Sequence, residues 1–456
     1  MDRANETVKR EKFQTSFGLI AAAIGSAVGL GNIWRFPYIT GVNGGGAFLI
    51  IYLFFVAIIG IPIMLAEFII GREAKKDAIG SYKALAPKGK WHIAGILGVL
   101  AAFFILSFYS IVAGWTLEYL FSAILNKFQG QSVAEIGEGF AAFTSDPIRP
   151  IFWQLIVMSI TVYVVASGVE KGIEKYSKIL IPLLFVLVVI LDIRAITLPG
   201  GTAGLEFLFK PDFSKLKAQG VLDALGHSFF SLSLGMAIMV TYGSYIKEDE
   251  SLGSTAVKVG ISDTIVALMA GIAIFPAVFS FGISPEEGAG LVFVTLPNVF
   301  LQMPGGYLFS VMFFALLALA AITSTISLLE AVTAHVIEKF NMERTKATLI
   351  TATLITIVGI IASLSNGPLS HKKILGKNLF DFLDYLTANY FLTMSALISS
   401  VFVGWSLDKR IVENQLTNDG RLQIKYVKLI SFILKFIAPI AILIVFLTGI
   451  EVIKLS

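Results

Sequence analysis

The chain has 456 residues, of which 56% are hydrophobic and 14% are charged, and its formal net charge is +4. This composition excludes an ordinary soluble globular protein, in which about 25% of the residues are charged. The chain contains no cysteine, so disulfide bonds and thiolate metal sites are excluded. The small positive charge does not require a nucleic-acid partner, because the basic residues concentrate in short loops between apolar segments.

Eleven apolar segments are each long enough to cross a bilayer as a helix. They predict an all-α membrane protein in which residues 1–456 form one transmembrane domain embedded in the lipid bilayer. The predicted spans are 17–39, 47–70, 91–125, 151–168, 179–198, 221–246, 256–283, 306–340, 348–364, 379–407 and 427–450.

The loops between the spans carry unequal numbers of basic residues. On the side that includes residues 1–16 and 71–90, the loops contain 20 Lys and Arg, and the opposite loops contain 10. Cytoplasmic loops are enriched in these residues. We therefore expect a multi-pass protein of the inner (plasma) membrane with a cytoplasmic N-terminus. An odd number of spans places the C-terminus outside.

The first span is interrupted by the sequence Gly25-Ser-Ala-Val-Gly-Leu-Gly31. Each glycine costs a helix about 1 kcal/mol relative to alanine. A backbone that leaves the helix inside a membrane is tolerated where protein or water satisfies its amides and carbonyls. The freed amides suit an anion and the freed carbonyls suit a cation, so this break is a candidate site of an ion-coupled transporter.

A second interruption is predicted in the sixth span, where Ser228-Phe-Phe-Ser-Leu-Ser-Leu-Gly235 lies at mid-depth. Two breaks five spans apart are typical of two five-helix repeats with inverted topology. The repeats would cover about 15–200 and 220–408, and one additional helix would follow at about 427–450. We also expect short surface helices in the loops 126–150 and 193–220, and a hairpin over the outer face at 284–305.

Polar residues inside the spans are the next candidates, because such groups are costly in a membrane and usually face an interior cavity. Thr323 and Ser324 are neighbouring hydroxyls in the eighth span, where they either bind a cation or only pack against other helices. Asp263 lies in an apolar run and is either a cation ligand or a cap at the start of the seventh span. Arg35 and Asp384 form an outer gate if they pair.

Other polar residues are predicted to have supporting roles. Glu67 in the second span is expected to hold backbone groups or groups of the seventh span, and His227 to lie at the edge of the outer vestibule. The run Gly44-Gly45-Gly46 predicts tight packing between the first two spans. The sequence has no His-Glu-x-x-His or Gly-x-Ser-x-Gly motif, so we do not expect an enzyme.

Two segments of the first spans resemble the signature of the neurotransmitter:sodium symporter family: Gly25-Ser-Ala-Val-Gly-Leu-Gly-Asn-Ile-Trp-Arg-Phe-Pro37 and Asn43-Gly-Gly-Gly-Ala-Phe48. Phe229-Phe-Ser-Leu-Ser-Leu-Gly235 and Thr323-Ser324 are similar to it as well. The likeness extends along essentially the whole chain. The eleven predicted spans resemble the bacterial amino-acid transporters of the family more than its twelve-span animal members.

The resemblance implies two sodium sites, a substrate pocket and two gates. The first sodium site would be formed by Ala27, Asn32, Ser231 and Asp263 with the substrate carboxylate. The second would be formed by Gly25, Val28, Ala320, Thr323 and Ser324. The substrate would contact Ala27, Leu30, Gly31, Ile105, Tyr109, Phe230, Ser231, Ser233, Met236, Ser324 and Leu328. The gates would be Arg35 with Asp384 on the outside, under which Phe230 closes, and Arg10 with Glu338 on the inside.

Three positions depart from the family pattern. Asp263 stands where asparagine is common, His227 where glutamine is frequent, and Met236 where an aromatic residue is common. A carboxylate in the seventh span can supply the negative charge that chloride supplies in other members. We therefore expect chloride-independent transport, with Asp263 as a candidate carrier of a proton in the opposite direction.

The resulting hypothesis is a symporter that imports hydrophobic or aromatic L-amino acids with two sodium ions by alternating access. We also expect its fifth span to open at the cytoplasmic end, near Gly172 and Pro182, because both residues weaken helical hydrogen bonding. The alternatives are a proton-coupled amino-acid exchanger and a non-transporting amino-acid sensor. A homodimer is compatible with the sequence but not required by it.

Overall fold

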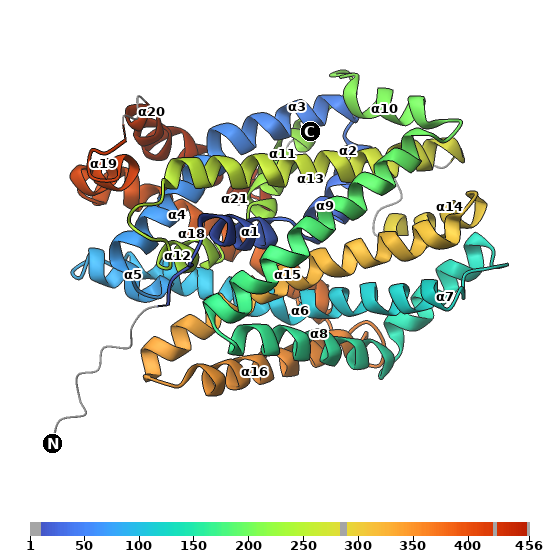
Figure 1. The fold of residues 1–456 in the computed structure, drawn as a ribbon, viewed down its shortest axis with the longest axis horizontal. Coiled ribbons are helices and arrows are strands. Elements are labelled where there is room, and N and C mark those ends of the chain that lie inside the picture. Colours follow the sequence, from blue (N-terminus) through green and yellow to red (C-terminus); the bar gives the residue numbers. More distant parts are fainter. Residues whose placement is uncertain (1–10, 283–289, 423–425, 454–456) are drawn as a thin grey trace.

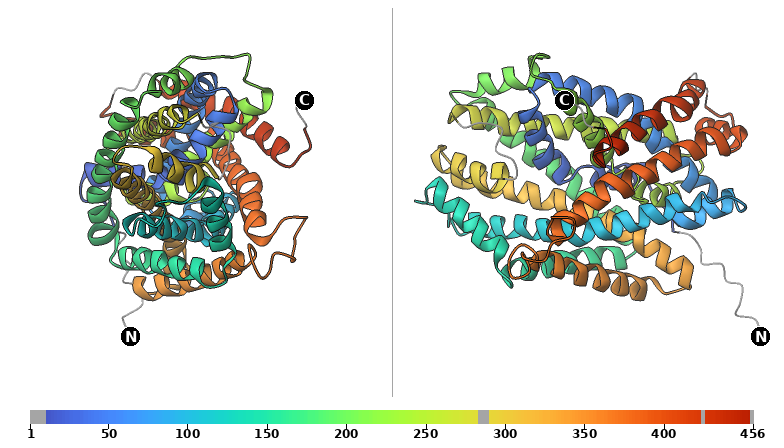
Figure 2. Two further views of the ribbon diagram at one scale, coloured as in Figure 1. Left: turned by 90° about the vertical axis from the view of Figure 1, so that its right-hand side faces the viewer. Right: turned by 180° about the vertical axis from the view of Figure 1, so that it is seen from behind.

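The computed structural model describes residues 11–282, 290–422 and 426–453. Within these ranges the chain is helical, with only isolated bridges of extended backbone and no β-strand. Long helices lie side by side in a bundle around a central pair of interrupted helices (Figures 1 and 2). The predicted all-α membrane fold is confirmed.

Nine helices of the described residues are long and apolar enough to cross a membrane. In chain order they are α3–η2–α4 (Gly46–Ala74), α6 (His92–Ile124), α8 (Arg149–Ala166), η3–α9 (Val169–Ile196), α13 (Leu252–Ser280), α15 (Gly306–Phe340), α16 (Arg344–Leu364), α17–η5–α18–η6 (Leu379–Ser406) and α20–η7–α21 (Val427–Gly449). The π-helical turns inside them are η2 (Val56–Gly60), η3 (Val169–Glu174), η5 (Thr387–Leu392), η6 (Phe402–Ser406) and η7 (Ile433–Ile437).

The first and sixth predicted spans are the two that the structure interrupts. In the first, α1 (Ser16–Ala27) is followed by η1 (Gly31–Arg35) and α2 (Phe36–Val42), and the two halves are bent by 49°. In the sixth, α11 (Ala218–Ser231) and α12 (Ile238–Gly243) are separate short helices. The bent first span brings the count of apolar spans among the described residues to ten, and α11 with α12 occupies the remaining predicted segment, the sixth.

Short helices cover the two ends of the bundle. The surface helices predicted within 126–150 and 193–220 are present as α7 (Val133–Ser145) and α10 (Gly201–Phe209). The others are α5 (Ala78–Leu85), α14 (Leu296–Gln302), which continues η4 (Leu291–Thr295), and α19 (Lys409–Thr417).

The predicted hairpin at 284–305 lies only partly within the described residues, which resume at Gly290. Leu291, Val292 and Phe293 are fully buried, as their apolar side chains suggest, and Val294 is partly exposed. The Phe293 ring lies 5.0 Å from that of Tyr119 on α6. These contacts fix this segment against the bundle.

The central helix α1 is buried because its side chains are small. Ala21, Ala22 and Ala23 are fully covered, and α1 packs against α9, α13 and α15. Small residues allow such close approach of helices in a membrane. The break at the end of α1 is thereby held in the middle of the bundle (Figure 1).

The glycine run at 44–46 packs against a different partner from the one predicted. A Cβ on Gly45 would lie 2.1 Å from the carbonyl oxygen of Phe207, and one on Gly46 would lie 2.9 Å from the carbonyl carbon of Lys210. Gly45 also has a positive φ of 63°. The run therefore packs against the segment around α10, a contact between residues too distant in sequence to be inferred from the motif.

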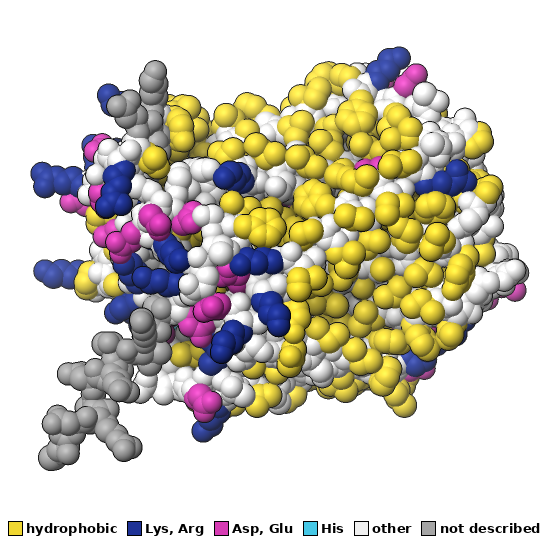
Figure 3. Space-filling view, viewed as in Figure 1, with side chains coloured by type: hydrophobic (Ala, Val, Ile, Leu, Met, Phe, Trp, Pro, Cys, Tyr) yellow, Lys and Arg dark blue, Asp and Glu magenta, His cyan; other side chains and the backbone are white. Residues whose placement is uncertain are grey.

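Charged side chains gather at one end of the molecule, where α5 and α19 lie, and a broad apolar surface covers the middle (Figure 3). This distribution fits a bilayer around the apolar surface.

Candidate transport site

The break in the first span exposes backbone groups beside polar side chains. Val28 ends α1 with extended backbone (φ −73°, ψ 108°), and its amide still bonds to the carbonyl of Ile24 at 2.7 Å. The next amides bind side chains: that of Gly29 donates to Asn32 Oδ1 at 3.1 Å, and that of Leu30 donates to the Tyr109 hydroxyl at 3.1 Å. Leu30 and Tyr109 are therefore neighbours at the break, as predicted.

The break in the sixth span is longer and more irregular. Between α11 and α12, Ser233, Gly235 and Ala237 all have positive φ values, of 55°, 74° and 61°. Such backbone is unfavourable for residues with a Cβ unless surrounding contacts stabilise it. Glu67 provides one contact, because its carboxylate accepts the Gly235 amide at 2.8 Å. Glu67 thus binds a backbone group, as predicted, and this group is an amide of the sixth span.

Hydrogen bonds join the two breaks to each other and to α15. The Ser233 hydroxyl donates to the Ser26 carbonyl at 2.8 Å, and the Ser324 hydroxyl donates to the same carbonyl at 3.4 Å. The last carbonyls of a helix lack partners within that helix. Here, side chains from two other spans satisfy one of them, so the three elements meet at one point.

Asp263 is the centre of a buried polar cluster. Its carboxylate accepts the Asn32 amide at 2.7 Å, the Ser231 hydroxyl at 2.8 Å and the Tyr52 hydroxyl at 3.2 Å. The side chain is fully buried. The cap alternative is excluded, since Asp263 lies in the interior of α13 and Ser251 caps that helix.

Tyr52 was missed by the sequence analysis. It is fully buried, and its hydroxyl also lies 3.3 Å from that of Ser231. The available signal was a single phenolic group in the otherwise apolar stretch of α3. A buried hydroxyl needs a hydrogen-bond partner.

The first predicted cation site fits the chemistry of sodium. Asn32, Ser231 and Asp263 meet in this cluster beside the end of α1, where Ala27 is the last helical residue. Among the described residues, no group of three or more His, Cys, Asp or Glu could hold a metal. One carboxylate with neutral oxygens is a donor set for a hard cation rather than for a transition metal.

The second predicted cation site lies where α1 meets α15. A Cβ on Gly25 would lie 3.3 Å from Thr323 Cβ, so the two helices are in close contact there. The hydroxyls of Thr323 and Ser324 lie 3.0 Å and 3.3 Å from the Ala320 carbonyl. These hydroxyl and carbonyl oxygens, with the carbonyls of Gly25 and Val28 at the end of α1, are a donor set that suits sodium.

A small cavity of about 30 Å³ lies between the breaks, and all predicted substrate contacts line it except Leu30. Its lining residues are Ser26, Ala27, Gly29, Gly31, Ile105, Tyr109, Phe230, Ser231, Ser233, Met236, Ile238, Ser324 and Leu328. Three lining residues were not predicted as substrate contacts: Ser26, Gly29 and Ile238, the first residue of α12. Apart from hydroxyls and backbone the lining is apolar, and it contains no charged side chain.

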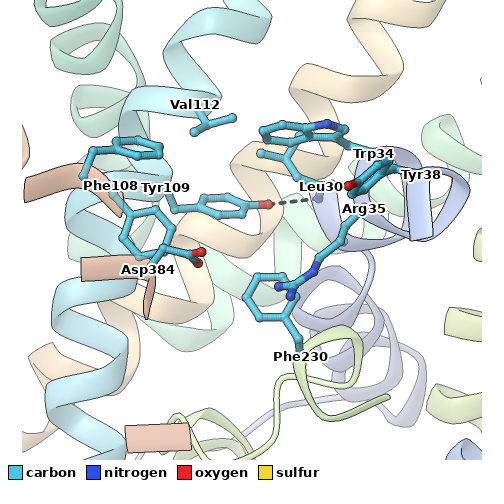
Figure 4. Close-up of a pocket in the computed structure, with 11 residues that line it drawn as sticks. Leu30, Trp34, Arg35, Tyr38, Phe108, Tyr109, Val112, Phe230 and Asp384 are labelled. Atoms are coloured by element: carbon cyan, nitrogen blue, oxygen red, sulfur yellow. Dashed lines mark hydrogen bonds between the residues drawn. The ribbon is translucent and has the colours of Figure 1, made fainter. Parts of the chain in front are cut away.

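A larger cavity of about 300 Å³, which we call the outer cavity because it contains both residues of the predicted outer gate, is lined in part by Leu30, Arg35, Phe230 and Asp384 (Figure 4). Arg35 and Asp384 approach it from opposite sides, and in the described part of the chain they form no ion pair. The Arg35 guanidinium lies instead 5.1 Å from the centre of the Phe230 ring. Phe230 lines both cavities, together with Gly31 and Tyr109.

His227 lines a lateral cavity of about 190 Å³ together with Arg35. Its ring is buried, stacks 6.0 Å from that of Phe36 and has no hydrogen-bond partner for either nitrogen. His227 therefore lies close to Arg35, a residue of the predicted outer gate.

The predicted inner gate lies partly outside the described residues, because Arg10 is not among them. The Glu338 carboxylate accepts the Asp77 amide at 2.9 Å. A second network lies nearby, in which Arg344 binds the buried Glu330 at 2.7 Å and Glu11 at 2.9 Å.

Together, the two interrupted helices, the buried oxygen clusters and the cavities between them define a membrane transporter rather than an enzyme. The sequence profile of the Sodium:neurotransmitter symporter family matches residues 10–136 and 135–456. The chain belongs to this family and is a sodium-dependent symporter.

Relatives and a solved structure agree with this assignment. The chain is 40% identical to YhdH, an uncharacterized sodium-dependent transporter of Bacillus subtilis, over 98% of this chain and 99% of that protein. It is 35% identical to a sodium-dependent transporter of Haemophilus influenzae, over 97% and 98% of the two chains. A crystal structure of MhsT in complex with L-phenylalanine has 47% identity and a TM-score of 0.89, covering 96% of this chain and 100% of MhsT.

Proposed function

We propose that this protein imports hydrophobic and aromatic L-amino acids together with two sodium ions. The single observation that carries the substrate class is the lining of the small cavity, where Ile105, Phe230, Met236 and Leu328 surround hydroxyls and backbone without a charged side chain. The similarity to MhsT, solved with L-phenylalanine, supports the same class.

The two ends of the amino acid would be recognised by different parts of the breaks. The carboxylate would bind the amides of Leu30 and Gly31 and the hydroxyl of Tyr109, because amides of a broken helix have no carbonyl partner within the helix. It would replace the hydrogen bond that the Leu30 amide donates to the Tyr109 hydroxyl. The ammonium would bind carbonyls of Ala27 and Phe230 near Ser233. The cavity of about 30 Å³ is smaller than an amino acid, so Phe230, Met236 and their neighbours must move apart when substrate binds.

Sodium, when bound, supplies positive charge that stabilises the substrate carboxylate and orders the broken helices. Asn32, Ser231 and Asp263 with Ala27 would hold one ion, and Thr323, Ser324 and Ala320 with Gly25 and Val28 the other. Two sodium ions and a zwitterion bring net positive charge to mid-membrane, which is costly without a counter-charge. Asp263 would provide that charge in place of chloride and would return with a proton.

Alternating access would use the cavities on either side of Phe230. Arg35 and Asp384 would pair once substrate is bound and close the outer cavity. The charged end of the molecule, with α5 and α19, would face the cytoplasm (Figure 3), since basic residues favour that side. The start of α1 would then be cytoplasmic and the end of α21 external.

Uptake into proteoliposomes tests this function. We expect L-phenylalanine and L-leucine to accumulate when an inward sodium gradient is applied, and not when choline replaces sodium. L-lysine and L-glutamate should not compete. Uptake driven equally well by a proton gradient without sodium would indicate an exchanger, and substrate binding without counterflow would indicate a sensor. Equal affinity for charged amino acids would contradict the substrate class.

A further inference from the structure

Two glutamates connect the segment before α1 to the first turn of the fifth span. Glu11 accepts the backbone amide of Val169, the first residue of η3. In the opposite direction, Glu174 at the end of η3 accepts the amides of Gln14 at 2.7 Å and Thr15 at 3.2 Å. Each segment therefore contributes one carboxylate that binds backbone of the other, and we name this pair of contacts the glutamate clasp.

Both carboxylates of the clasp act at the start of a helix. Val169 follows Gly168, whose φ of 93° marks the turn into the fifth span. Thr15 precedes α1 and caps it, since its hydroxyl accepts the Gly18 amide at 3.0 Å. The first amides of a helix lack partners within the helix and favour negative charge. Each glutamate thus stabilises the beginning of the other segment's helix.

The surroundings are shaped to hold Glu174 in this position. Glu174 is buried and also accepts the Thr15 hydroxyl at 2.7 Å. A Cβ on Gly18 would lie 2.3 Å from Glu174 Cγ, so only glycine leaves room for the carboxylate beside α1. Lys178, one turn further along α9, pairs with Glu174 at 2.6 Å.

Glu11 connects the clasp to the helix that carries the second predicted sodium site. Its carboxylate pairs with Arg344 at 2.9 Å, and Arg344 binds the buried Glu330 of α15. A cavity of about 700 Å³ lies beside the clasp and is lined by Glu11, Gln14, Gly168 and Val169. Water in this cavity would reach the fifth span as soon as η3 and the N-terminal segment separate.

We infer that the glutamate clasp makes release of the N-terminal segment and opening of the fifth span one cooperative step, with Glu11 and Glu174 as positioning residues for release to the cytoplasm. This inference rests on the proposed function and on the expectation from the sequence that the fifth span opens at its cytoplasmic end, near Gly172 and Pro182. Unwinding η3 withdraws the Val169 amide and the Glu174 carboxylate together. The first amide of η3 then loses its acceptor and the buried Glu174 carboxylate loses its backbone donors, which is unfavourable.

A cysteine reporter can measure the opening directly, because the chain contains no cysteine of its own. Ile181 of α9 is suited to this purpose: its Cδ1 atom would lie 3.3 Å from a Cβ on Gly25, between the fifth span and the second predicted sodium site. The Ile181→Cys protein in inside-out vesicles is treated with a membrane-impermeant maleimide, and the rate of labelling is followed.

The variants Glu11→Gln and Glu174→Gln are compared with Glu170→Gln. Glu170 also contacts the N-terminal segment, but only through the exposed side chain of Gln14 at 3.2 Å. Loss of a charged hydrogen bond should raise the labelling rate about fivefold or more for Glu11→Gln and Glu174→Gln, and Glu170→Gln should leave it unchanged. The double variant should label no faster than the faster single variant, because loss of either contact would already free the segment that makes the other.

Gly18→Ala tests the clasp without a change of charge. It should displace Glu174 and speed labelling, whereas Gly139→Ala, where a Cβ meets no atom within 4 Å, should not. The inference would be refuted if Glu11→Gln and Glu174→Gln left the labelling rate unchanged. It would also be refuted if the fold increase in the double variant equalled the product of the two single increases.

Uptake measurements distinguish a failure of the clasp inference from a failure of the proposed function. Glu174→Gln should change the turnover number of L-phenylalanine uptake while the apparent affinity from the outer side stays constant, whereas a merely structural defect would lower the amount of binding protein. A wild-type protein that transports no amino acid would refute the proposed function, and the labelling comparison would still decide the clasp.

Discussion

The side-chain amide of Asn32 donates a hydrogen bond of 2.7 Å to the carboxylate of Asp263, and so joins the first interrupted span to the seventh span. The Ser231 hydroxyl, from the second interrupted helix, donates to the same carboxylate at 2.8 Å. A buried carboxylate requires such partners. The Asp263 carboxylate is therefore hydrogen-bonded to both interrupted spans, and its removal should affect the structure of both.

Asp263→Asn should weaken sodium binding and remove the fixed counter-charge. We expect wild-type uptake to be the same in chloride and in gluconate. We expect the variant to lose at least about tenfold in sodium affinity, or about 1.4 kcal/mol, and its remaining uptake to require chloride. The measurement is sodium-dependent uptake of L-phenylalanine with each anion.

The control for this prediction is Asp192→Asn, which removes another buried carboxylate, located in α9, whose Oδ1 has no hydrogen-bond partner. Wild-type uptake that falls in gluconate would contradict the counter-charge role. Uptake that is insensitive to internal pH in both the wild type and Asp263→Asn would contradict only the return of a proton.

Thr323→Ala combined with Ser324→Ala should abolish sodium-dependent substrate binding while the protein remains folded, because both hydroxyls would be ligands of one ion. Scintillation proximity binding over a range of sodium concentrations measures this effect. Thr325→Ala is the matched control, since the Thr325 hydroxyl faces Thr161 at 2.8 Å instead of the break. Wild-type sodium affinity in the double variant would show that the two hydroxyls only pack the helices.

Gly29→Ala should reduce substrate affinity at least about tenfold, or about 1.4 kcal/mol. A Cβ at this position would lie 2.6 Å from the Ser324 hydroxyl oxygen and 2.9 Å from that of Tyr109, so the break would have to shift. Gly226→Ala is the control, because its Cβ would meet only Val445, at 3.9 Å. The measurement is L-phenylalanine binding. If the two variants bind with equal affinity, the close contact of Gly29 with Ser324 and Tyr109 does not determine substrate affinity.

Asp384→Asn should slow transport more than it weakens binding, because Asp384 and Arg35 are separated across the outer cavity and would pair only when it closes. We expect a loss of about tenfold or more in turnover, which corresponds to about 1.4 kcal/mol of barrier height, with the dissociation constant changed less than threefold. Asp381→Asn, a neighbouring carboxylate on α17, is the control. Turnover equal to that of the wild type would show that the pair is not a gate.

Much of the site could be predicted because its signals are local in the sequence. The breaks in the first and sixth spans follow from glycine and hydroxyl residues inside apolar segments, which disfavour a continuous helix wherever they occur. Asp263 and the pair Thr323 and Ser324 stand out because polar groups are costly in a membrane. The structure brings these residues together at the breaks.

The sequence by itself determined the class of fold and the positions of the interrupted spans, since hydrophobicity and helix-breaking residues act over a few neighbours. Most of the residues of the small cavity followed from the resemblance of the sequence to a known family. Only the tertiary structure decided that Tyr52 joins Asp263, that the glycine run packs against Phe207, and that Arg35 lies over Phe230 instead of pairing with Asp384. Those contacts depend on which side chains come within hydrogen-bonding or van der Waals distance after the helices have packed, and this distance is not encoded in any single segment.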